Sequence, residues 1–220
     1  SRAKNGVILI FTKRGQEGRP RVEFSTDFSL SQTPKRYALN KSPFAGYTDN
    51  VYTGAVIGAE VERFDIQDFI FRDAQGTTNS LSVSGANGGT SYYVSGQYNS
   101  GEGIVRSTGF SKQSARVKVS QQLGNRLSIT ANTNFVQSHT DLMPEGEQTQ
   151  GVLTSAIFTP TTFNFNFNPN TGRYPYNPTL GPNALDILEN WQAKEDVTRF
   201  IGSLEGNLQL TDNLRARYLF

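Results

Sequence analysis

Apolar and polar residues alternate one by one along much of this chain from residue 20 onward. Successive side chains of a β-strand point to opposite faces, so a period of two predicts strands with one apolar and one polar face. The first such stretch, residues 21–30, places on one face Val22, Phe24, Thr26, Phe28 and Leu30. Its other face carries Arg21, Glu23, Ser25, Asp27 and Ser29. The stretch is therefore predicted to be a strand with one face in contact with water and one apolar face that is not.

The same alternation returns in later segments, at residues 115–120, 127–136, 199–210 and 214–220. In the second of these, the apolar face is predicted to consist of Leu127, Ile129, Ala131 and Phe135. The opposite face is predicted to consist of Ser128, Thr130, Asn132 and Asn134. Together with strands expected on both sides of the turn at residues 87–89, the chain is predicted to contain about seven strands.

The connections between these strands are predicted to be alternately short and long. Gly, Asn and Asp mark tight hairpin turns at residues 87–89, 123–125 and 211–213. Long connections are predicted at about 32–77, 101–110 and 140–196. Transmembrane barrels have short turns at one end and long loops at the other. A soluble β-sandwich or adhesin module, which also has alternating strands, is the alternative, although it has no reason to separate short from long connections.

Strand length agrees with a membrane barrel. Strands of about ten residues, rising ~3.3 Å each and tilted by ~40°, span roughly the 25 Å apolar band of an outer-membrane barrel. The predicted fold class is therefore all-β, an antiparallel transmembrane β-barrel. In that fold the apolar set at 127–135 faces lipid and the polar set at 128–134 faces the lumen.

Composition and charge narrow the picture further. Only 35% of the residues are hydrophobic and the mean hydropathy is −0.48, which suits a sheet with one polar face. The sequence contains no apolar run of about 18 residues, so any membrane crossing has to be made by strands. The 21 basic and 19 acidic residues are mixed, which offers no basic stripe for nucleic acid. The chain has no Cys, so thiolate metal sites and disulfides are excluded.

No set of residues predicts catalysis, a metal site or a cofactor site. His139 is the only His, which excludes most zinc spacings, and it is predicted to lie at an extracellular strand end. Asp65, Asp68 and Asp73 come nearest to a carboxylate cluster, but their spacing matches no calcium loop. We interpret them as part of a solvated loop or short helix, and the protein is not expected to be an enzyme.

The connection at about 140–196 is unusually rich in aromatic and amide side chains. Aromatic faces beside amides are what sugars and peptides bind, by stacking and hydrogen bonding. The candidate contact residues are Phe163, Phe165, Phe167, Arg173, Tyr174 and Tyr176. Alternatively, these aromatic side chains pack the loop onto the barrel rim or onto a partner. Residues 182–191 are predicted to form a short helix, with Asn183 as N-cap and Leu185, Leu188 and Trp191 as its packing face.

The first fourteen residues, SRAKNGVILIFTKR, begin without Met and without a signal-peptide pattern. We expect the chain to be an internal segment of a longer protein. Residues 7–11 form a continuous apolar run without alternation, followed by a linker at 15–20. This pattern predicts a buried strand outside the barrel wall.

Five ordered blocks carry a family resemblance. SRAKNGVILI at residues 1–10, followed by TKRG at 12–15 and GRPRV at 18–22, resembles the plug-to-barrel junction of SusC/RagA-type TonB-dependent outer-membrane transporters. The blocks that resemble the family's first barrel hairpins are DIQDFIFR at 65–72, NSLSVSGAN at 79–87, TSYYVS at 90–95 and GEGIV at 101–105. Two positions depart from the family, Ile66 where Trp is common and Phe69 where a polar residue is usual.

The resemblance implies an organisation and a function. Residues 1–14 would be the end of a plug domain, and residues 15–220 the first strands of a 22-stranded barrel in the outer membrane. The protein would import oligosaccharides or peptides, energised by TonB acting on a plug region outside this chain. A SusD-like surface lipoprotein would close over the extracellular loops. The alternatives are a non-transporting scaffold subunit of an outer-membrane assembly and a siderophore-type TonB-dependent receptor.

Overall fold

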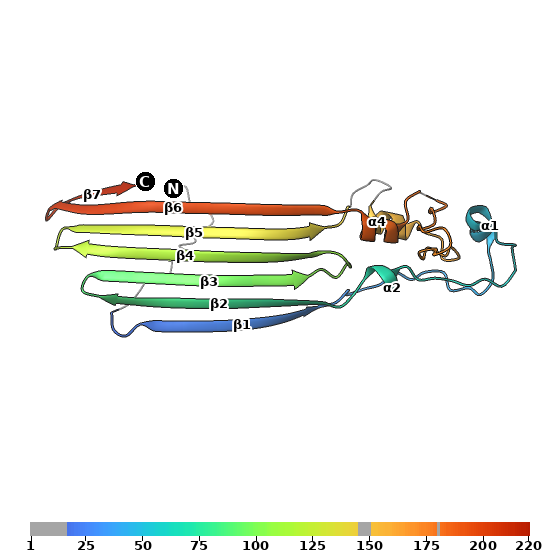
Figure 1. Ribbon diagram of the computed structural model, residues 1–220, viewed down its shortest axis with the longest axis horizontal. Coiled ribbons are helices and arrows are strands. Elements are labelled where there is room, and N and C mark those ends of the chain that lie inside the picture. The colour runs from blue at the N-terminus through green and yellow to red at the C-terminus, as the bar shows by residue number, and fades with distance from the viewer. Residues whose placement is uncertain (1–16, 145–150, 180) are drawn as a thin grey trace, which may run out of the picture.

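The computed structural model describes residues 17–144, 151–179 and 181–220, and its regular structure is dominated by one antiparallel sheet (Figure 1). The strands pair in chain order, each with the next. They are β1 (Arg21–Ser31), β2 (Ala74–Asn87), β3 (Thr90–Glu102), β4 (Gly109–Leu123), β5 (Leu127–Leu142), β6 (Ala193–Thr211) and β7 (Leu214–Leu219). The helices are α1 (Tyr47–Thr53), α2 (Gln67–Ile70), α3 (Val152–Ile157) and α4 (Ala184–Asn190). The all-β antiparallel fold predicted from the sequence is confirmed.

Two expectations fall on residues that the structure does not describe. The apolar run at 7–11 and the segment 1–14, assigned to the end of a plug, both lie outside the described residues. No helix in the described part of the chain is long and apolar enough to cross a bilayer.

The long connections lie at one end of the sheet and the short turns at the other (Figure 1). β1 and β2 are joined through residues 32–73, and β5 and β6 through residues 143–192. The third connection, predicted at about 101–110, lies at this end but is shorter than expected: β3 and β4 extend until only residues 103–108 separate them. Near the long connections, the side chains of these strands do not alternate between apolar and polar. The alternation therefore predicts strands that are shorter than the hydrogen-bonded ones.

The turn between β2 and β3 shows why glycine is needed at the short end. Asn87 pairs with Thr90, which leaves Gly88 and Gly89 as the two central residues of the hairpin. Both have positive φ, 56° and 81°. Two successive positive φ values match the right-handed twist of the flanking strands and are strained for any residue with a Cβ.

The sheet presents an apolar face that is not covered by the rest of the described chain. Register places Phe24, Leu81, Gly96, Ala115, Phe135 and Phe200 in one row across six strands. Phe24 is 70% exposed in this row. The next residue on each strand points to the opposite face, where side chains such as Ser82, Ser95 and Asn134 are half-buried. We call the first the outer face and the second the inner face.

The buried core of the described residues lies in the long connections rather than in the sheet. Its members come from α2, α3, α4, the β3–β4 turn and the segment around Phe165. They are Ile66, Ile70, Val105, Val152, Ala156, Phe165, Ala184, Leu185, Ile187 and Leu188. A soluble sandwich would place its core between sheets, so this distribution favours a sheet whose apolar face meets something other than water.

Candidate functional site

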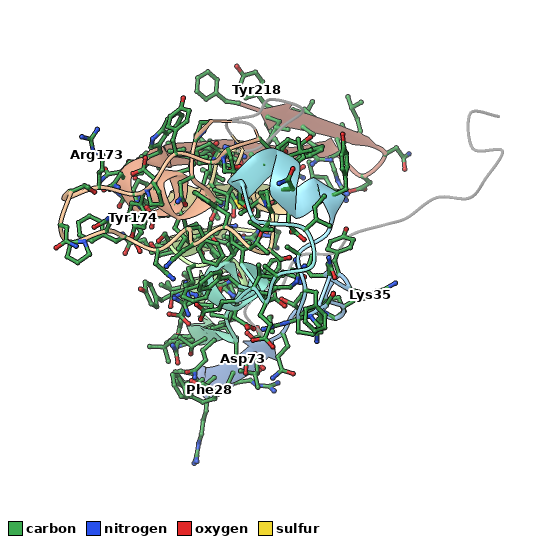
Figure 2. The ribbon with its side chains drawn as sticks, turned by 90° about the vertical axis from the view of Figure 1, so that its right-hand side faces the viewer. Phe28, Lys35, Asp73, Arg173, Tyr174 and Tyr218 are labelled. Carbon is green, nitrogen blue, oxygen red and sulfur yellow. The ribbon has the colours of Figure 1, made fainter. Side chains whose placement is uncertain are left out.

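The connections at the long end fold into a single body, which we call the cap: the described residues of 32–73, 103–108 and 143–192. α2 contacts α4, and α3 packs against α4. Ile66 and Phe69, the two departures from the family pattern, take part in this packing, Ile66 as a buried core residue and Phe69 at its edge. The cap therefore has its own packed interior, and Figure 2 shows the side chains at this end of the molecule.

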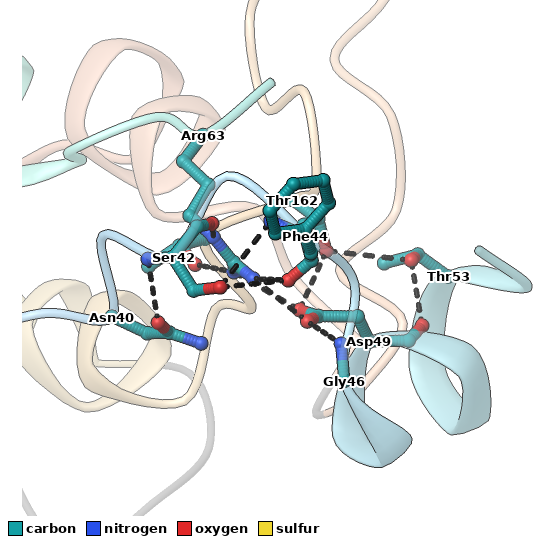
Figure 3. Close-up of polar contacts among 9 residues, drawn as sticks. Asn40, Ser42, Phe44, Gly46, Asp49, Thr53, Arg63 and Thr162 are labelled. Carbon is teal, nitrogen blue, oxygen red and sulfur yellow. Dashed lines mark hydrogen bonds and ion pairs between the residues drawn. The ribbon is translucent and has the colours of Figure 1, made fainter. Parts of the chain in front are cut away.

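A buried ion pair within the β1–β2 connection is hydrogen-bonded by two threonines of the β5–β6 connection (Figure 3). Arg63 donates from Nη2 to Oδ2 of Asp49 at 2.9 Å and from Nη1 to Oδ1 at 3.1 Å. The side chains are only 10% and 7% exposed, respectively. Thr161 and Thr162 reach them from the other connection: Arg63 Nη1 donates to Thr161 Oγ1 at 2.6 Å, and Thr162 Oγ1 donates to Asp49 Oδ1 at 3.1 Å.

The carboxylate of Asp49 is stabilised in its charged form. The hydrogen bonds from Arg63, assisted by the backbone N–H of Gly46 at 2.8 Å, hold the pKa of Asp49 at about 2. Burial acts in the opposite direction, because it disfavours the charged form, but the donors outweigh it. A charge that is buried and paired on both oxygens contributes to the structure of the cap rather than to chemistry.

Phe165 is a core residue of the cap. It is 1% exposed, and its ring packs edge-on against Phe69 at 5.1 Å and Phe64 at 5.9 Å between centroids. Aromatic pairs favour this arrangement because the positive edge of one ring meets the negative face of the other. Phe165 has no accessible surface for a ligand or a partner, so we withdraw it from the candidate contact residues.

The asparagines around Phe165 bend the backbone. Oδ1 of Asn164 accepts from the backbone N–H of Asn166 at 3.1 Å, and Oδ1 of Asn168 accepts from that of Asn170 at 2.9 Å. These are local turns in which a side chain replaces a backbone acceptor. Neighbouring Phe side chains consequently leave the segment in different directions, although they are spaced by two residues.

Phe167 and Tyr174 form the outer aromatic pair of the segment. Their rings lie edge-on at 5.4 Å between centroids, and the Tyr174 hydroxyl donates to Oε2 of Glu189 on α4. Burial, together with this hydrogen bond to a carboxylate, raises the pKa of Tyr174 to about 12. Tyr174 thus braces the segment against α4, while Phe167 remains 50% exposed.

The other predicted contact residues differ in accessibility. Arg173 is exposed at the edge of the cap, where Figure 2 shows it pointing away from the body, and Tyr176 is 78% exposed. Phe163 is half-buried against the core. The structure therefore places Phe167, Arg173 and Tyr176 at the surface.

Buried amides hold the segment in place. Nδ2 of Asn177 donates to Oγ1 of Thr159 at 2.9 Å, and Nδ2 of Asn183 donates to the carbonyl of Phe165 at 2.8 Å. Asn183 also accepts from the backbone N–H of Leu185 at 2.9 Å, so its predicted role as N-cap of α4 is confirmed. These two amides are occupied by the cap itself and are not available to a ligand.

The packing face predicted for α4 was partly wrong. Leu185 and Leu188 are buried as expected, but Trp191 follows the last helical residue and is 43% exposed. Ile187 is fully buried instead. Because α4 ends at Asn190 and the chain turns extended at Trp191, the helical spacing no longer determines where the indole points.

Sequence reasoning missed an exposed apolar surface around α1, at the outermost tip of the cap (Figure 1). Its members are more than half exposed: Phe44, Tyr47, Val51, Val56 and Ile57. Tyr47 and Val51 are four residues apart, which places them on the same side of a helix. That spacing was the available signal.

The acidic residues and the histidine considered from the sequence all have partners. Asp65, Asp68 and Asp73 bind, respectively, the backbone of Gln67, the guanidinium of Arg36 and the amide of Gln32. His139 lies near the long end of β5, with Nδ1 2.7 Å from Asp196 and Nε2 3.3 Å from Asp141. Within the described ranges, no three His, Cys, Asp or Glu side chains are arranged to hold a metal ion.

Sequence comparison finds curated relatives over most of the chain. The TonB-dependent receptor SusC of Bacteroides thetaiotaomicron is 29% identical over 93% of this chain, and TonB-dependent receptor P3 of Formosa agariphila is 27% identical over 86%. The chain spans about a fifth of the length of these relatives, 22% and 19%. No protein-family model matches the chain.

Solved structures share the fold. The RagAB peptide importer in its "closed-closed" state matches 99% of this chain and 29% of its own with a TM-score of 0.65, and the "open-open" state matches with 0.63. Their sequence identities are 20% and 18%, so the structural match concerns the fold alone. Together with the curated relatives, it confirms the predicted resemblance of this chain to the SusC/RagA-type TonB-dependent receptors.

Proposed function

We propose that this chain belongs to a TonB-dependent importer of the SusC/RagA type in the outer membrane. Residues 15–220 would supply the first strands of its barrel and residues 1–14 the end of its plug. The imported molecule would be an oligosaccharide or a peptide, taken up without any bond being made or broken. The similarity to SusC and the fold shared with a peptide importer support this proposal.

The observation that carries the proposal is the separation of the molecule into an outer face that is apolar and a cap that is folded. Rows of exposed Phe, Leu and Val on the sheet favour an apolar environment, because soluble proteins rarely expose patches of this extent. The cap, at one end of the same strands, has its own buried core. A sheet immersed in lipid with an ordered extracellular cap fits both features.

Within this proposal, the cap binds the SusD-like lid or the imported molecule. The surface comprises Phe167, Arg173 and Tyr176, which are exposed while Tyr174 and Phe163 hold their segment on the cap. Aromatic and Arg side chains are enriched among the anchors of interfaces, and a rigid support reduces the backbone entropy that is lost on binding.

The test uses the full-length protein co-expressed with the SusD-like lipoprotein. Truncation of an anchor costs about 2 kcal/mol, so Phe167→Ala, Arg173→Ala and Tyr176→Ala should each weaken capture of the lid on the order of 30-fold. Lys35→Ala is the matched control, because Lys35 is an exposed cation on the opposite edge of the cap (Figure 2). If none of the three substitutions weakened capture of the lid, these residues would not be part of the interface.

Transport is measured separately, as TonB-dependent uptake of fluorescent oligosaccharides and oligopeptides by cells lacking the native copy. Uptake of either class that stops when TonB is deleted supports the importer. A protein that assembles with its lid but imports neither class would instead fit the scaffold alternative. Uptake of an iron-siderophore complex alone would fit the siderophore branch.

A further inference from the structure

The outer face of the sheet contains a groove centred on Gly96. Its floor is formed by Gly96 and its neighbour Ala115, the smallest side chains in their row, and its walls by Leu81, Phe24 and Phe135. A Cβ added at Gly96 would meet no atom within 4 Å. The groove has a volume of about 580 Å³. All the strands that surround it, β1 to β5, lie within the described residues.

One end of the groove is apolar and the other is polar. Towards the short turns the outer face continues with Val83, Val94 and Val117, and then with Tyr92 and Val119. Towards the cap, the next row consists of Asn79, Tyr98, Gln113 and Gln137. This polar row lies two residues from the row that contains Gly96, about 7 Å along the strand. Apolar surface therefore gives way to amide and hydroxyl groups within the length of the groove itself.

The polar row has free hydrogen-bonding capacity. Nε2 of Gln113 donates to Oε1 of Gln137 at 3.0 Å, which leaves the Gln113 carbonyl and the Gln137 amino group directed elsewhere. The row contains no charged side chain across β2 to β5. Neutral amides beside an aromatic ring suit the hydroxyl groups of a saccharide, whereas a phosphate would call for Arg or Lys.

We propose that this groove binds one outer-leaflet glycolipid. An acyl chain lies over Gly96 and Ala115 between Phe24 and Phe135, and the saccharide headgroup bonds Gln113, Gln137 and Tyr98. The proposal rests on the membrane placement of the sheet proposed above. It adds a specific site to a surface that bulk lipid would otherwise cover uniformly, and it does not depend on what the protein imports.

The test compares two glycines that share the outer face. The full-length protein is extracted from native outer membranes in a mild detergent, and the lipids that remain bound are identified and counted by mass spectrometry. Gly96→Trp fills the groove and should abolish retention of the glycolipid. Gly206→Trp is the matched control, because Gly206 also lies on the outer face with nothing within 4 Å of an added Cβ, and it should retain the lipid.

A second variant does not depend on tolerance of a large side chain. Gln113→Leu combined with Gln137→Leu keeps the volume of the rim but removes the hydrogen bonds of both amides, each worth about 1 kcal/mol, so glycolipid retention should fall by on the order of 30-fold. Equal retention by the wild type, Gly96→Trp and the double Leu variant would overturn the proposal. Phospholipid held in place of glycolipid would also overturn it. Failure of transport alone, with lipid retention intact, would count against the proposed function only.

Discussion

Arg63 and Asp49 form a bidentate ion pair beneath the surface of the cap, at 2.9 and 3.1 Å, and both partners come from the connection between β1 and β2. The same two groups are bonded by Thr161 and Thr162 of the connection between β5 and β6. Two loops that are about a hundred residues apart in sequence are thereby held at one point. Any motion of the cap on binding has to carry both loops together or break this network.

We expect Asp49→Asn to loosen the cap while leaving the barrel intact. The substitution leaves the Arg63 charge buried without its counterion, which should lower the free energy of opening the cap by about 3 kcal/mol. Hydrogen exchange of α1 and of the segment around Thr161 measures this opening. Asp68→Asn is the control, because its pair with Arg36 is exposed and should contribute no more than about 1 kcal/mol. Equal effects of the two substitutions would contradict the role assigned to burial.

The cap should lose stability in acid through Asp49. The pKa of Asp49 is about 2 when folded, below the ordinary value of 3.8 for an Asp, so the stabilisation is fully present above pH ~4 and is lost as the pH falls through ~2. A shift of this size corresponds to about 2 kcal/mol. Cleavage of the cap by an acid protease should therefore rise between pH 4 and pH 2 in the wild type. In Asp49→Asn this rise should be much smaller, since the group that titrates is gone.

Phe165 and Phe167 should behave differently when truncated. Phe165→Ala removes a buried ring with two aromatic neighbours and should destabilise the cap by about 3 to 5 kcal/mol. Phe167→Ala removes a half-exposed ring and should cost well under half of that. Hydrogen exchange of α3 and α4 reports both values. Similar losses in the two variants would mean that Phe167 is packed against a part of the protein outside the described residues.

The two faces of β5 should differ in their tolerance of charge. Ile129 lies on the outer face and Thr130 on the inner face. In a bilayer, Ile129→Lys should cost about 2 to 4 kcal/mol, whereas Thr130→Lys should cost much less because the inner face is wet. Folding of the full-length protein into vesicles, followed over a denaturant series, gives both values. Equal costs would contradict the assignment of the outer face to lipid.

Much of the fold was predictable because the two faces of a strand follow from the alternation of neighbouring residues in the sequence. Alternation placed Leu127, Ile129 and Phe135 on one side of β5, and the structure has them there, because successive residues of a strand point to opposite faces whatever lies around them. The Gly and Asn turns were equally local, since positive φ at Gly88 and Gly89 depends on the residue type itself. The strand ends near the cap were not predictable, because backbone pairing continues there without an apolar face to mark it.

The sequence by itself determined the strands, their faces, the short turns and the N-cap at Asn183, each of which depends on neighbours within a few residues. Only the tertiary structure decided that Phe165 is buried and Phe167 exposed, although the two have the same spacing and the same Asn neighbours. In a strand, both would share a face, but the Asn turns remove that periodicity. The direction of each ring then depends on Phe64, Phe69 and Tyr174. Contacts between segments so distant in sequence arise from the packing of the two loops, which no local pattern encodes.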